Sequence, residues 1–250
     1  MVRRPPTTKY VRSYRPARAG PLIAAAPFMR CDSTLPAPLL NAEEAARLAL
    51  IASIISFPKG AWLYHEGDEA DFVYNVIEGE VKTFCAFSSG RRRVTAFVFP
   101  GDLMGLAGNG RYISTAQAIT PVTAYRFPLR SLDDLLRSDS QLEHRFLCKV
   151  CHDLRAAQSH AITLGRRDAR GKIAMFLREL EVNHVAESNV ARPIFLPMTR
   201  SDVADYLGLS LEAVSRSFRK LEDSGIIRFD DRRDVRIVDR ARFEKLAVAL

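Results

Sequence analysis

Residues 199–227 constrain the fold more than any other part of the chain, because they spell two short helices joined by a tight turn. Thr199 followed by Asp202 is a capping-box-like helix start. Gly208 ends that helix, and Ser210 is a favourable N-cap for the next one. The apolar residues of the second helix recur at spacings of 3, 4 and 3 and predict one buried stripe: Leu211, Val214, Phe218 and Leu221. The pattern predicts a helix-turn-helix.

The same helical period places polar side chains on the opposite, exposed face of the second helix. Arg216 can pair with O6 and N7 of a guanine, Glu212 can accept from N4 of the paired cytosine, and Ser215 suits a thymine edge. A helix that carries these groups on one turn is suited to the major groove of DNA. Taken alone, Glu-x-x-Ser-Arg also fits an ordinary charged surface helix. The capped preceding helix and the glycine turn favour base readout.

These residues resemble the recognition helix of the CRP/FNR superfamily of bacterial transcription regulators. Within it, E-x-x-S-R resembles the FNR and FixK branch, whose sites are built on TTGAT half-sites. Cyclic-AMP receptor proteins carry an additional Arg just before the Glu, where this chain has Leu211. The resemblance therefore implies the inverted repeat TTGAT-N4-ATCAA. Four residues are better placed for phosphates, which position a protein without specifying sequence: Thr199, Arg200, Ser210 and Arg219.

Composition agrees with an anionic partner. The 250 residues include 37 Lys and Arg against 29 Asp and Glu, a net charge of +8. Such a charge suits double-stranded DNA, although many basic proteins bind none. No run of 18 apolar residues predicts a membrane span. Four scattered cysteines do not make a secreted disulfide scaffold, so we expect a cytoplasmic protein.

Residues 1–40 are predicted to be a disordered basic arm. The first thirty residues contain several prolines and no acid, and their seven basic residues are Arg3, Arg4, Lys9, Arg12, Arg15, Arg18 and Arg30. Such a tract buries too little apolar surface to order itself. It superficially resembles an Arg-rich transit peptide, but we favour an extension with weak affinity for phosphates.

Residues 41–140 read as an antiparallel β-roll. From residue 57, short strands rich in aromatic and β-branched residues alternate with turns that place Gly67 and Gly79 where positive φ angles are needed. Residues 91–99 and 122–127 read as further strands. The pattern KG-x4-EGD-x-ADFVYNVIEGEV resembles the cyclic-nucleotide-binding-domain fold, the sensory half of CRP/FNR proteins.

The residue pairs that bind a cyclic nucleotide in that fold are not found in this sequence. Cyclic-nucleotide binders hold the ribose with a Gly-Glu pair and the phosphate with an Arg-Ser or Arg-Thr pair, whereas this chain has Gly101 and Asp102, and Tyr112 follows Arg111. An FNR-like iron–sulfur cluster requires four thiolates, and only Cys31 lies near the N-terminus. We therefore predict a FixK-like protein without the iron–sulfur cysteines and with no cofactor.

Residues 141–165 are predicted to form a dimerisation helix that resembles the one of the family. Apolar residues at steps of 3 and 4 give a coiled-coil seam for a homodimer: Leu147, Val150, Leu154, Ala157, Ala161 and Leu164. Residues 148–152 also spell C-x-x-C-H, a haem-attachment motif. Val150 would lie in the dimer contact and leave no room for haem, so we interpret Cys148 and Cys151 as flanking the seam. Whether Cys148, Cys151 or Cys31 has a redox role stays open.

Residues 166–250 complete a winged helix-turn-helix domain, with a packed helix before it and a charged hairpin and closing helix after it. The predicted fold class is α+β: an N-terminal antiparallel β-roll, a long dimerisation helix and a C-terminal winged helix-turn-helix. The resemblance implies a homodimeric transcription regulator that works with RNA polymerase on microaerobic, denitrification or nitrogen-fixation genes.

Two other functions remain as alternatives. One is a regulator gated by haem, nitric oxide or a small effector in the β-roll. The other is a cyclic-nucleotide-binding signalling protein with an incidental basic tail. An enzyme is not expected, because no Ser/His/Asp grouping, paired carboxylates or metal cluster occurs at an informative spacing.

Overall fold

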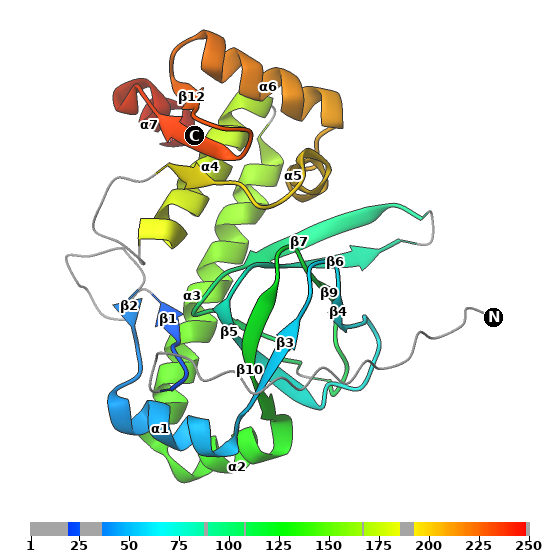
Figure 1. Cartoon of the computed structure of the whole chain (residues 1–250), viewed down its shortest axis with the longest axis vertical. Coiled ribbons are helices and arrows are strands. Elements are labelled where there is room, and N and C mark those ends of the chain that lie inside the picture. The colour runs from blue at the N-terminus through cyan, green and yellow to red at the C-terminus, as the bar shows by residue number, and fades with distance from the viewer. Residues whose placement is uncertain are drawn as a thin grey trace.

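The protein is organised along one long helix, α3 (Ser140–Gly165), which runs beside a β-roll and ends beneath a smaller helical domain (Figure 1). The computed structural model describes residues 20–25, 37–87, 90–107, 109–166, 168–185 and 193–248. Asp139 caps α3, because its side chain accepts from the backbone N–H groups of Gln141 and Leu142, each at 3.1 Å. The roll, the long helix and the helix-turn-helix occur in the predicted order.

The β-roll is built from two four-stranded antiparallel sheets that face each other (Figure 1). One sheet has the order β3-β10-β5-β8, from β3 (Ser53–Phe57), β10 (Val122–Pro128), β5 (Phe72–Glu78) and β8 (Leu103–Met104). The other has the order β4-β9-β6-β7, from β4 (Trp62–Tyr64), β9 (Thr115–Ala118), β6 (Val81–Ala86) and β7 (Arg92–Val98). The expected strands at 91–99 and 122–127 are present.

A tight turn between β5 and β6 shows why glycine is needed there. Gly79 has φ of 81°, which residues with a Cβ atom rarely adopt, and a Cβ at this position would lie 2.1 Å from the carbonyl oxygen of Pro121. The two sheets bury apolar residues between them, including Val76, Val81 and Ala124. This buried layer fixes the register of the strands, because a one-residue slip would turn those side chains outward.

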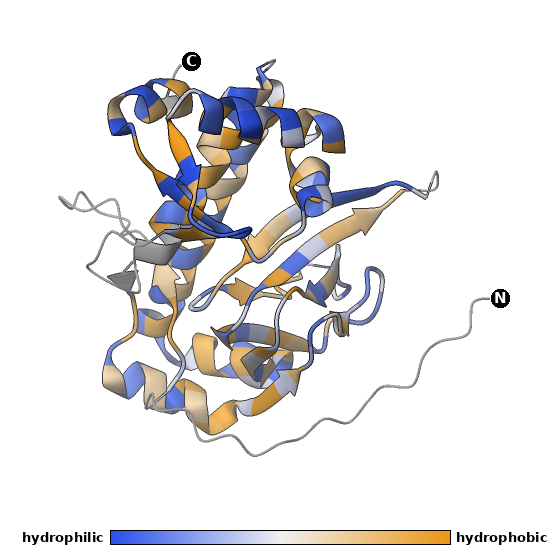
Figure 2. Cartoon of the chain, turned by 45° about the horizontal axis from the view of Figure 1, so that its top comes forward, coloured by the Kyte–Doolittle hydropathy of each residue, from blue (hydrophilic) through white to orange (hydrophobic). Residues whose placement is uncertain are grey.

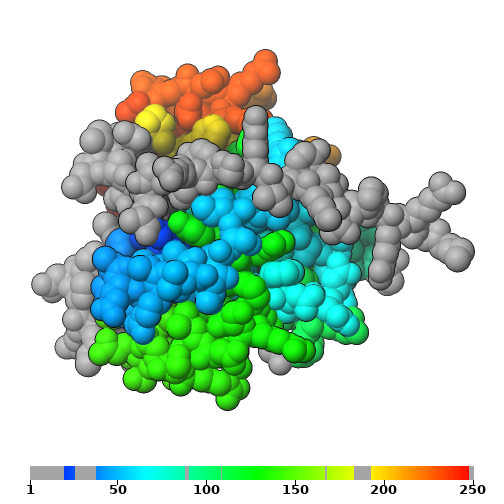
Figure 3. All heavy atoms as spheres, turned by 60° about the horizontal axis from the view of Figure 1, so that its bottom comes forward, coloured from blue at the N-terminus to red at the C-terminus, as the bar shows by residue number. Residues whose placement is uncertain are grey.

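Helices cover the end of the roll opposite the helix-turn-helix. Helix α1 (Ala42–Ile51) and helix α2 (Leu129–Ser138) lie side by side there (Figure 3). A full capping box starts α1: the backbone N–H of Asn41 donates to the Glu44 carboxylate at 2.7 Å, and the backbone N–H of Glu44 donates to the side-chain oxygen of Asn41 at 2.8 Å. A second core lies between these helices, α3 and the roll, and contains Leu48, Phe127, Leu132, Leu142 and Phe146.

The predicted boundary of the disordered arm at residue 40 does not hold for the residues that are described. Strand β1 (Ala24–Ala25) pairs with β2 (Ala37–Pro38), and the side chain of Ile23 is fully buried. The side-chain amide of Asn75 donates to the carbonyl oxygen of Leu22 at 2.8 Å. The apolar residues within the basic tract supply this anchor. Residues 1–19 and 26–36 lie outside the described residues.

The C-terminal half has the predicted winged helix-turn-helix order. Its elements are α4 (Ala169–Val185), β11 (Ile194–Phe195), α5 (Arg200–Leu207), α6 (Leu211–Asp223), β12 (Ile227–Phe229), β13 (Asp234–Ile237) and α7 (Arg240–Val248). The charged hairpin forms as β12 and β13. Strand β11 adds a third strand to it, in the order β11-β13-β12.

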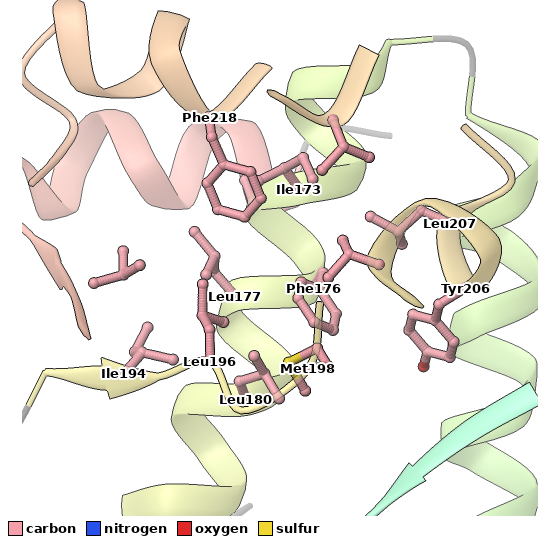
Figure 4. Close-up of a cluster of buried hydrophobic side chains, with 14 of the residues drawn as sticks. Ile173, Phe176, Leu177, Leu180, Ile194, Leu196, Met198, Tyr206, Leu207 and Phe218 are labelled. Carbon is pink, nitrogen blue, oxygen red and sulfur yellow. The ribbon is translucent and has the colours of Figure 1, made fainter. Parts of the chain in front are cut away.

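One apolar core holds this half together (Figure 4). Phe176 and Leu177 from α4 meet Leu207 from α5 and Phe218 from α6, all at most 3% exposed. The same cluster extends into the roll, where its members are Phe84, Val94, Phe99 and Ile119. The helix-turn-helix therefore does not rest on a separate core. Among the described residues, no helix is both long and apolar enough to cross a membrane.

Candidate nucleic-acid interface

Helix α5 begins with a complete capping box. The Thr199 hydroxyl accepts from the backbone N–H of Asp202 at 3.1 Å, while the Asp202 carboxylate accepts from the Thr199 N–H at 3.0 Å and from its hydroxyl at 2.6 Å. The helix ends at Gly208, which has φ of 64° in the left-handed region. These local contacts confirm the predicted start and end of the first helix.

Helix α6 begins at its own cap and buries one face. The Ser210 hydroxyl accepts from the backbone N–H of Ala213 at 3.1 Å. Val214, Phe218 and Leu221 are at most 3% exposed, as the periodicity predicted. Leu211 was wrongly placed in that stripe, because it is the first residue of the helix and its side chain is 51% exposed. The buried stripe begins one turn later than the sequence indicated.

The three residues proposed for base readout share the opposite face of α6. Glu212, Ser215 and Arg216 are all exposed, and Arg219 lies one turn further along, also exposed. Within the described part of the chain, none of these four side chains has a hydrogen bond or ion pair. Hydrophilic residues alternate with hydrophobic ones along the helices of this half (Figure 2). The arrangement leaves an acid, a hydroxyl and guanidinium groups available to an external partner.

The residues expected at phosphates divide into two groups. Thr199 and Ser210 are exposed at the N-termini of α5 and α6, where backbone N–H groups favour anions. Arg200 is half-buried, and its Cζ atom lies only 3.5 Å from the centre of the Phe218 ring. Its guanidinium group therefore faces the protein, unlike that of Arg219.

The β6–β7 hairpin of the β-roll packs against α5, the first helix of the helix-turn-helix. Lys82 on β6 forms an ion pair with Asp202, the capping residue of α5. Burial would raise the pKa of Asp202, but the hydrogen bonds from Lys82 and Thr199 outweigh it and lower the pKa below its ordinary value. Local spacing could not predict this contact, since the two residues are 120 positions apart.

An aromatic cluster connects α5 and β7 to α3. The ring of Tyr206 on α5 stacks on His160 of α3 at 3.9 Å and lies 5.0 Å from Phe97 of β7. The Tyr206 hydroxyl donates to the Glu179 carboxylate of α4. Burial lowers the pKa of His160 to about 4, with help from the positive charges of Arg93 and Lys172, so this imidazole is neutral at pH 7.

Lys172 connects the ends of two helices. Its ammonium group donates to the carbonyl oxygen of Leu164 at 3.0 Å and to that of Leu207 at 3.2 Å, which are the last-turn carbonyls of α3 and α5. Burial, together with the charge of Arg93, lowers the pKa of Lys172. These bonds satisfy carbonyl groups that have no partner within their own helices and fix the angle between α3 and the helix-turn-helix.

The residues predicted for a dimer seam form an apolar stripe on α3. Leu147 is 52% exposed, Val150 46% and Leu154 56%, and Ala157 and Ala161 are also exposed. Leu164 is half-buried, because its side chain lies against the turn at Gly208. Ile162, 49% exposed, lies at a b position beside the stripe and not within it. An exposed stripe of this length on one helix is typical of a protein contact.

The Gly101–Asp102 turn, which stands where cyclic-nucleotide binders have their ribose-binding Gly-Glu pair, takes part in an internal ion pair. Asp102 accepts from the fully buried ammonium group of Lys149 at 2.7 Å and from the backbone N–H of Phe99 at 3.0 Å. Arg111 donates to the carbonyl oxygen of Gly67 at 2.7 Å. Both side chains are thus bound to groups of the protein itself.

Three tyrosines fill the inside of the roll near that turn. The rings of Tyr64 and Tyr112 stack at 3.9 Å, and Tyr64 lies 5.9 Å from Tyr74. All three are less than 9% exposed, and the Tyr112 hydroxyl donates to the carbonyl oxygen of Phe72 at 2.8 Å. Side chains of the protein therefore occupy the space between the two sheets.

The two cysteines of the C-x-x-C-H motif differ in exposure on α3. Cys148 is buried, with its sulfur 3.7 Å from Nε2 of His144, whereas Cys151 is half-buried. Val150 lies between them on the exposed stripe. Among the described residues, no three His, Cys, Asp or Glu side chains are grouped to hold a metal ion. Cys31 lies outside the described residues.

Comparison with known proteins decides the family. Residues 54–139 match the cyclic nucleotide-binding domain, and residues 171–246 match the Crp-like helix-turn-helix domain. The nitrogen fixation regulation protein FixK of Bradyrhizobium diazoefficiens is 34% identical over 210 residues, which cover 84% of this chain and 88% of that protein. The chain belongs to the CRP/FNR family of transcription regulators.

Other relatives place it near the FixK branch. The transcriptional activatory protein AadR of Rhodopseudomonas palustris is 37% identical over 193 residues, or 77% of this chain and 80% of that protein. The solved structure of FixK2 from Bradyrhizobium japonicum superposes with a TM-score of 0.74 at 34% identity, covering 80% of this chain and 99% of that one. This CRP/FNR protein is therefore a FixK-like DNA-binding regulator and not an enzyme, as predicted.

Proposed function

We propose that this CRP/FNR protein binds as a homodimer to an inverted repeat of the form TTGAT-N4-ATCAA. The observation that carries the proposal is the single exposed turn of α6 that displays Glu212, Ser215 and Arg216. In the proposed complex Arg216 donates to a guanine, Glu212 accepts from the paired cytosine, and Ser215 contacts a thymine edge. Thr199, Ser210 and Arg219 contact phosphates and set the register.

The dimer is proposed to form through the stripe on α3. Leu147, Val150 and Leu154 are large apolar side chains at coiled-coil spacing, and each is about half exposed in the single chain. A parallel pair of these helices would relate the two copies by a two-fold axis. Two recognition helices would then enter successive major grooves about 34 Å apart, which is why the target is an inverted repeat.

The regulated genes are proposed to be those of microaerobic respiration, denitrification or nitrogen fixation, transcribed by RNA polymerase with this protein as activator. The support is the likeness to the nitrogen fixation regulation protein FixK and to the activatory protein AadR. The tyrosine-filled roll and the Asp102–Lys149 pair favour a protein that needs no bound effector. Without an effector to switch it on, the protein would be regulated by the amount that is synthesised. We propose that it acts in the cytoplasm.

The decisive experiment replaces Arg216 with Ala and measures binding by fluorescence anisotropy. The probes are a TTGAT-N4-ATCAA duplex, the same duplex with the guanine–cytosine pair exchanged in both half-sites, and a scrambled duplex. Loss of a bidentate contact costs about 1–3 kcal/mol per half-site and removes the preference for the original pair. Stability stays within about 0.5 kcal/mol of wild type, because the side chain is exposed and unpaired within the described part of the chain.

Arg219→Ala is the matched control, because it removes the same charge from the same helix one turn away. We expect it to weaken binding to all three duplexes alike and to flatten the dependence on salt. If Arg216→Ala instead weakens all three duplexes equally, Arg216 is not a base contact and the assignment is wrong. If wild-type protein binds the repeat and the scrambled duplex equally, the proposed target is wrong.

A further inference from the structure

One guanidinium group touches all three parts of the DNA-binding unit. Arg200 is the first residue of α5, and its Cζ atom lies 3.5 Å from the ring centre of Phe218 on α6 and 5.0 Å from that of Phe229 on β12. The two rings meet each other at 5.7 Å with an angle of 58°. Arg200 therefore stacks in the corner where the first helix, the recognition helix and the wing converge.

The surroundings of Arg200 differ from those of an arginine that waits for a phosphate. Its Nη1 atom is shielded from solvent and has no hydrogen-bond partner among the described residues. Burial lowers the pKa of this guanidinium group to about 10, against the opposing effect of Glu222, so it remains charged at pH 7. To reach a phosphate, the side chain would have to leave both rings and uncover them.

The corner is also where the wing is attached to the recognition helix. The Glu222 carboxylate near the end of α6 accepts from the backbone N–H of Phe229 at 3.2 Å. Phe229 pairs with Val235 across the wing, and Val235 is fully buried. A side chain that fills this corner sets the direction in which α6 leaves the wing.

We propose that Arg200 is a positioning residue for base readout, which holds α6 against the wing by packing over the adjoining rings of Phe218 and Phe229, and that it is not a phosphate contact. This replaces the phosphate role that its place in the sequence suggested. The proposal rests on the proposed function in one respect, namely that α6 reads the bases. Its physical content is that the packing of the side chain over the two rings matters and that its charge toward DNA does not.

The test compares Arg200→Met, which keeps apolar packing over the rings and removes the charge, with Arg200→Lys, which keeps the charge but does not keep the end of the side chain packed over the rings. A buried charge replaced by an apolar side chain of similar size is often tolerated. We expect Arg200→Met to bind the TTGAT-N4-ATCAA duplex within about twofold of wild type. We expect Arg200→Lys to lose about five- to tenfold in the ratio of specific to scrambled binding, because the ammonium group would move to water. The opposite order, with Lys near wild type and Met impaired, would overturn the proposal.

The salt dependence on scrambled DNA provides a second readout, which does not depend on the proposed target. Loss of one phosphate contact reduces the slope of log K against log salt by about 0.9 for each chain of the dimer. We expect no change for Arg200→Met and this reduction for Arg219→Met, the matched control. A reduced slope for Arg200→Met would show a phosphate contact and refute the positioning role. If wild type shows no preference for the repeat over scrambled DNA, the proposed target sequence is wrong. The salt dependence of Arg200→Met on scrambled DNA then still decides whether Arg200 contacts a phosphate.

A general loss of folding must be separated from positioning. All variants are compared at equal active concentration, determined by stoichiometric titration with DNA, and their melting temperatures are measured. Arg200→Ala and Phe229→Ala each remove one partner of the contact, so we expect each to lower discrimination and the double variant to lose no more than the stronger single one. Additive losses would mean that the two side chains act independently, which contradicts the proposal.

Discussion

Removing Asp102 is expected to destabilise the protein far more than removing its partner Lys149. The Lys149 side chain is 1% exposed, with its ammonium group 2.7 Å from Asp102 and 2.9 Å from Asp153. Burial alone would lower the pKa of Lys149, but the two carboxylates together raise it above its ordinary value. Asp102 and Asp153 are 29% and 43% exposed, so water can solvate both of them.

The expected magnitudes follow from this difference in burial. Asp102→Asn keeps an acceptor for the Phe99 N–H but leaves a buried ammonium group with one partner. Breaking a buried pair in this way costs about 3–5 kcal/mol, and we expect the lower end because Asp153 remains. At this chain length a loss of about 3 kcal/mol lowers the melting temperature by roughly 6–12 °C. Lys149→Met fills the same space without charge and is expected to stay within about 1 kcal/mol of wild type.

Thermal and urea unfolding of the two single variants and the double variant test this reasoning. With Lys149 replaced by Met, the Asp102→Asn change no longer leaves a buried charge unpaired, so the double variant should regain most of the loss. Asp153→Asn is the matched control, because it removes a more exposed carboxylate from the same ammonium group. Equal losses for the two single variants, or additive losses in the double variant, would refute the argument from burial.

Three further predictions concern other parts of the molecule. His160 has a pKa of about 4 when folded against about 6.5 when unfolded, so stability falls as pH decreases from about 6.5 to 4, and His160→Phe should flatten that part of a melting-temperature profile. Leu154→Glu should yield monomers in analytical ultracentrifugation, whereas Ser159→Glu, at an f position of the same helix, should remain dimeric. Gly208→Ala should cost about 1–2 kcal/mol in urea unfolding because φ is 64°, whereas Gly165→Ala, which faces open space, should be nearly neutral.

The parts of the fold that the sequence predicted depend on neighbouring residues. The capping box of Thr199 and Asp202, the left-handed Gly208 and the stripe on α6 all arise within a few residues, so spacing and residue type reveal them. Strand β11 was missed for the opposite reason. Its two residues gain their partners from β13, about forty positions later, and nothing within the segment itself indicates a strand.

In the candidate site, too, the features that arise within one helix could be predicted from the sequence, and those that depend on distant residues could not. Exposure of Glu212, Ser215 and Arg216 follows from the period of one helix. The stacking of Arg200 was not foreseen, because it depends on Phe229, which comes from the wing and not from either helix. A charged residue at a helix N-terminus resembles a phosphate ligand in sequence, whether its side chain points outward or into an aromatic corner.

The apolar cluster that unites the roll hairpin with the helix-turn-helix has a practical consequence. Phe84, Val94 and Phe99 are covered by side chains of the C-terminal half, so excising residues 166–250 would expose both faces of that contact to water. We expect the excised fragment to be poorly soluble and to melt below the intact chain, and we expect the intact chain to unfold in one transition. Exchange of DNA-reading halves between related regulators would then succeed only when the hairpin is carried along with the half that it covers.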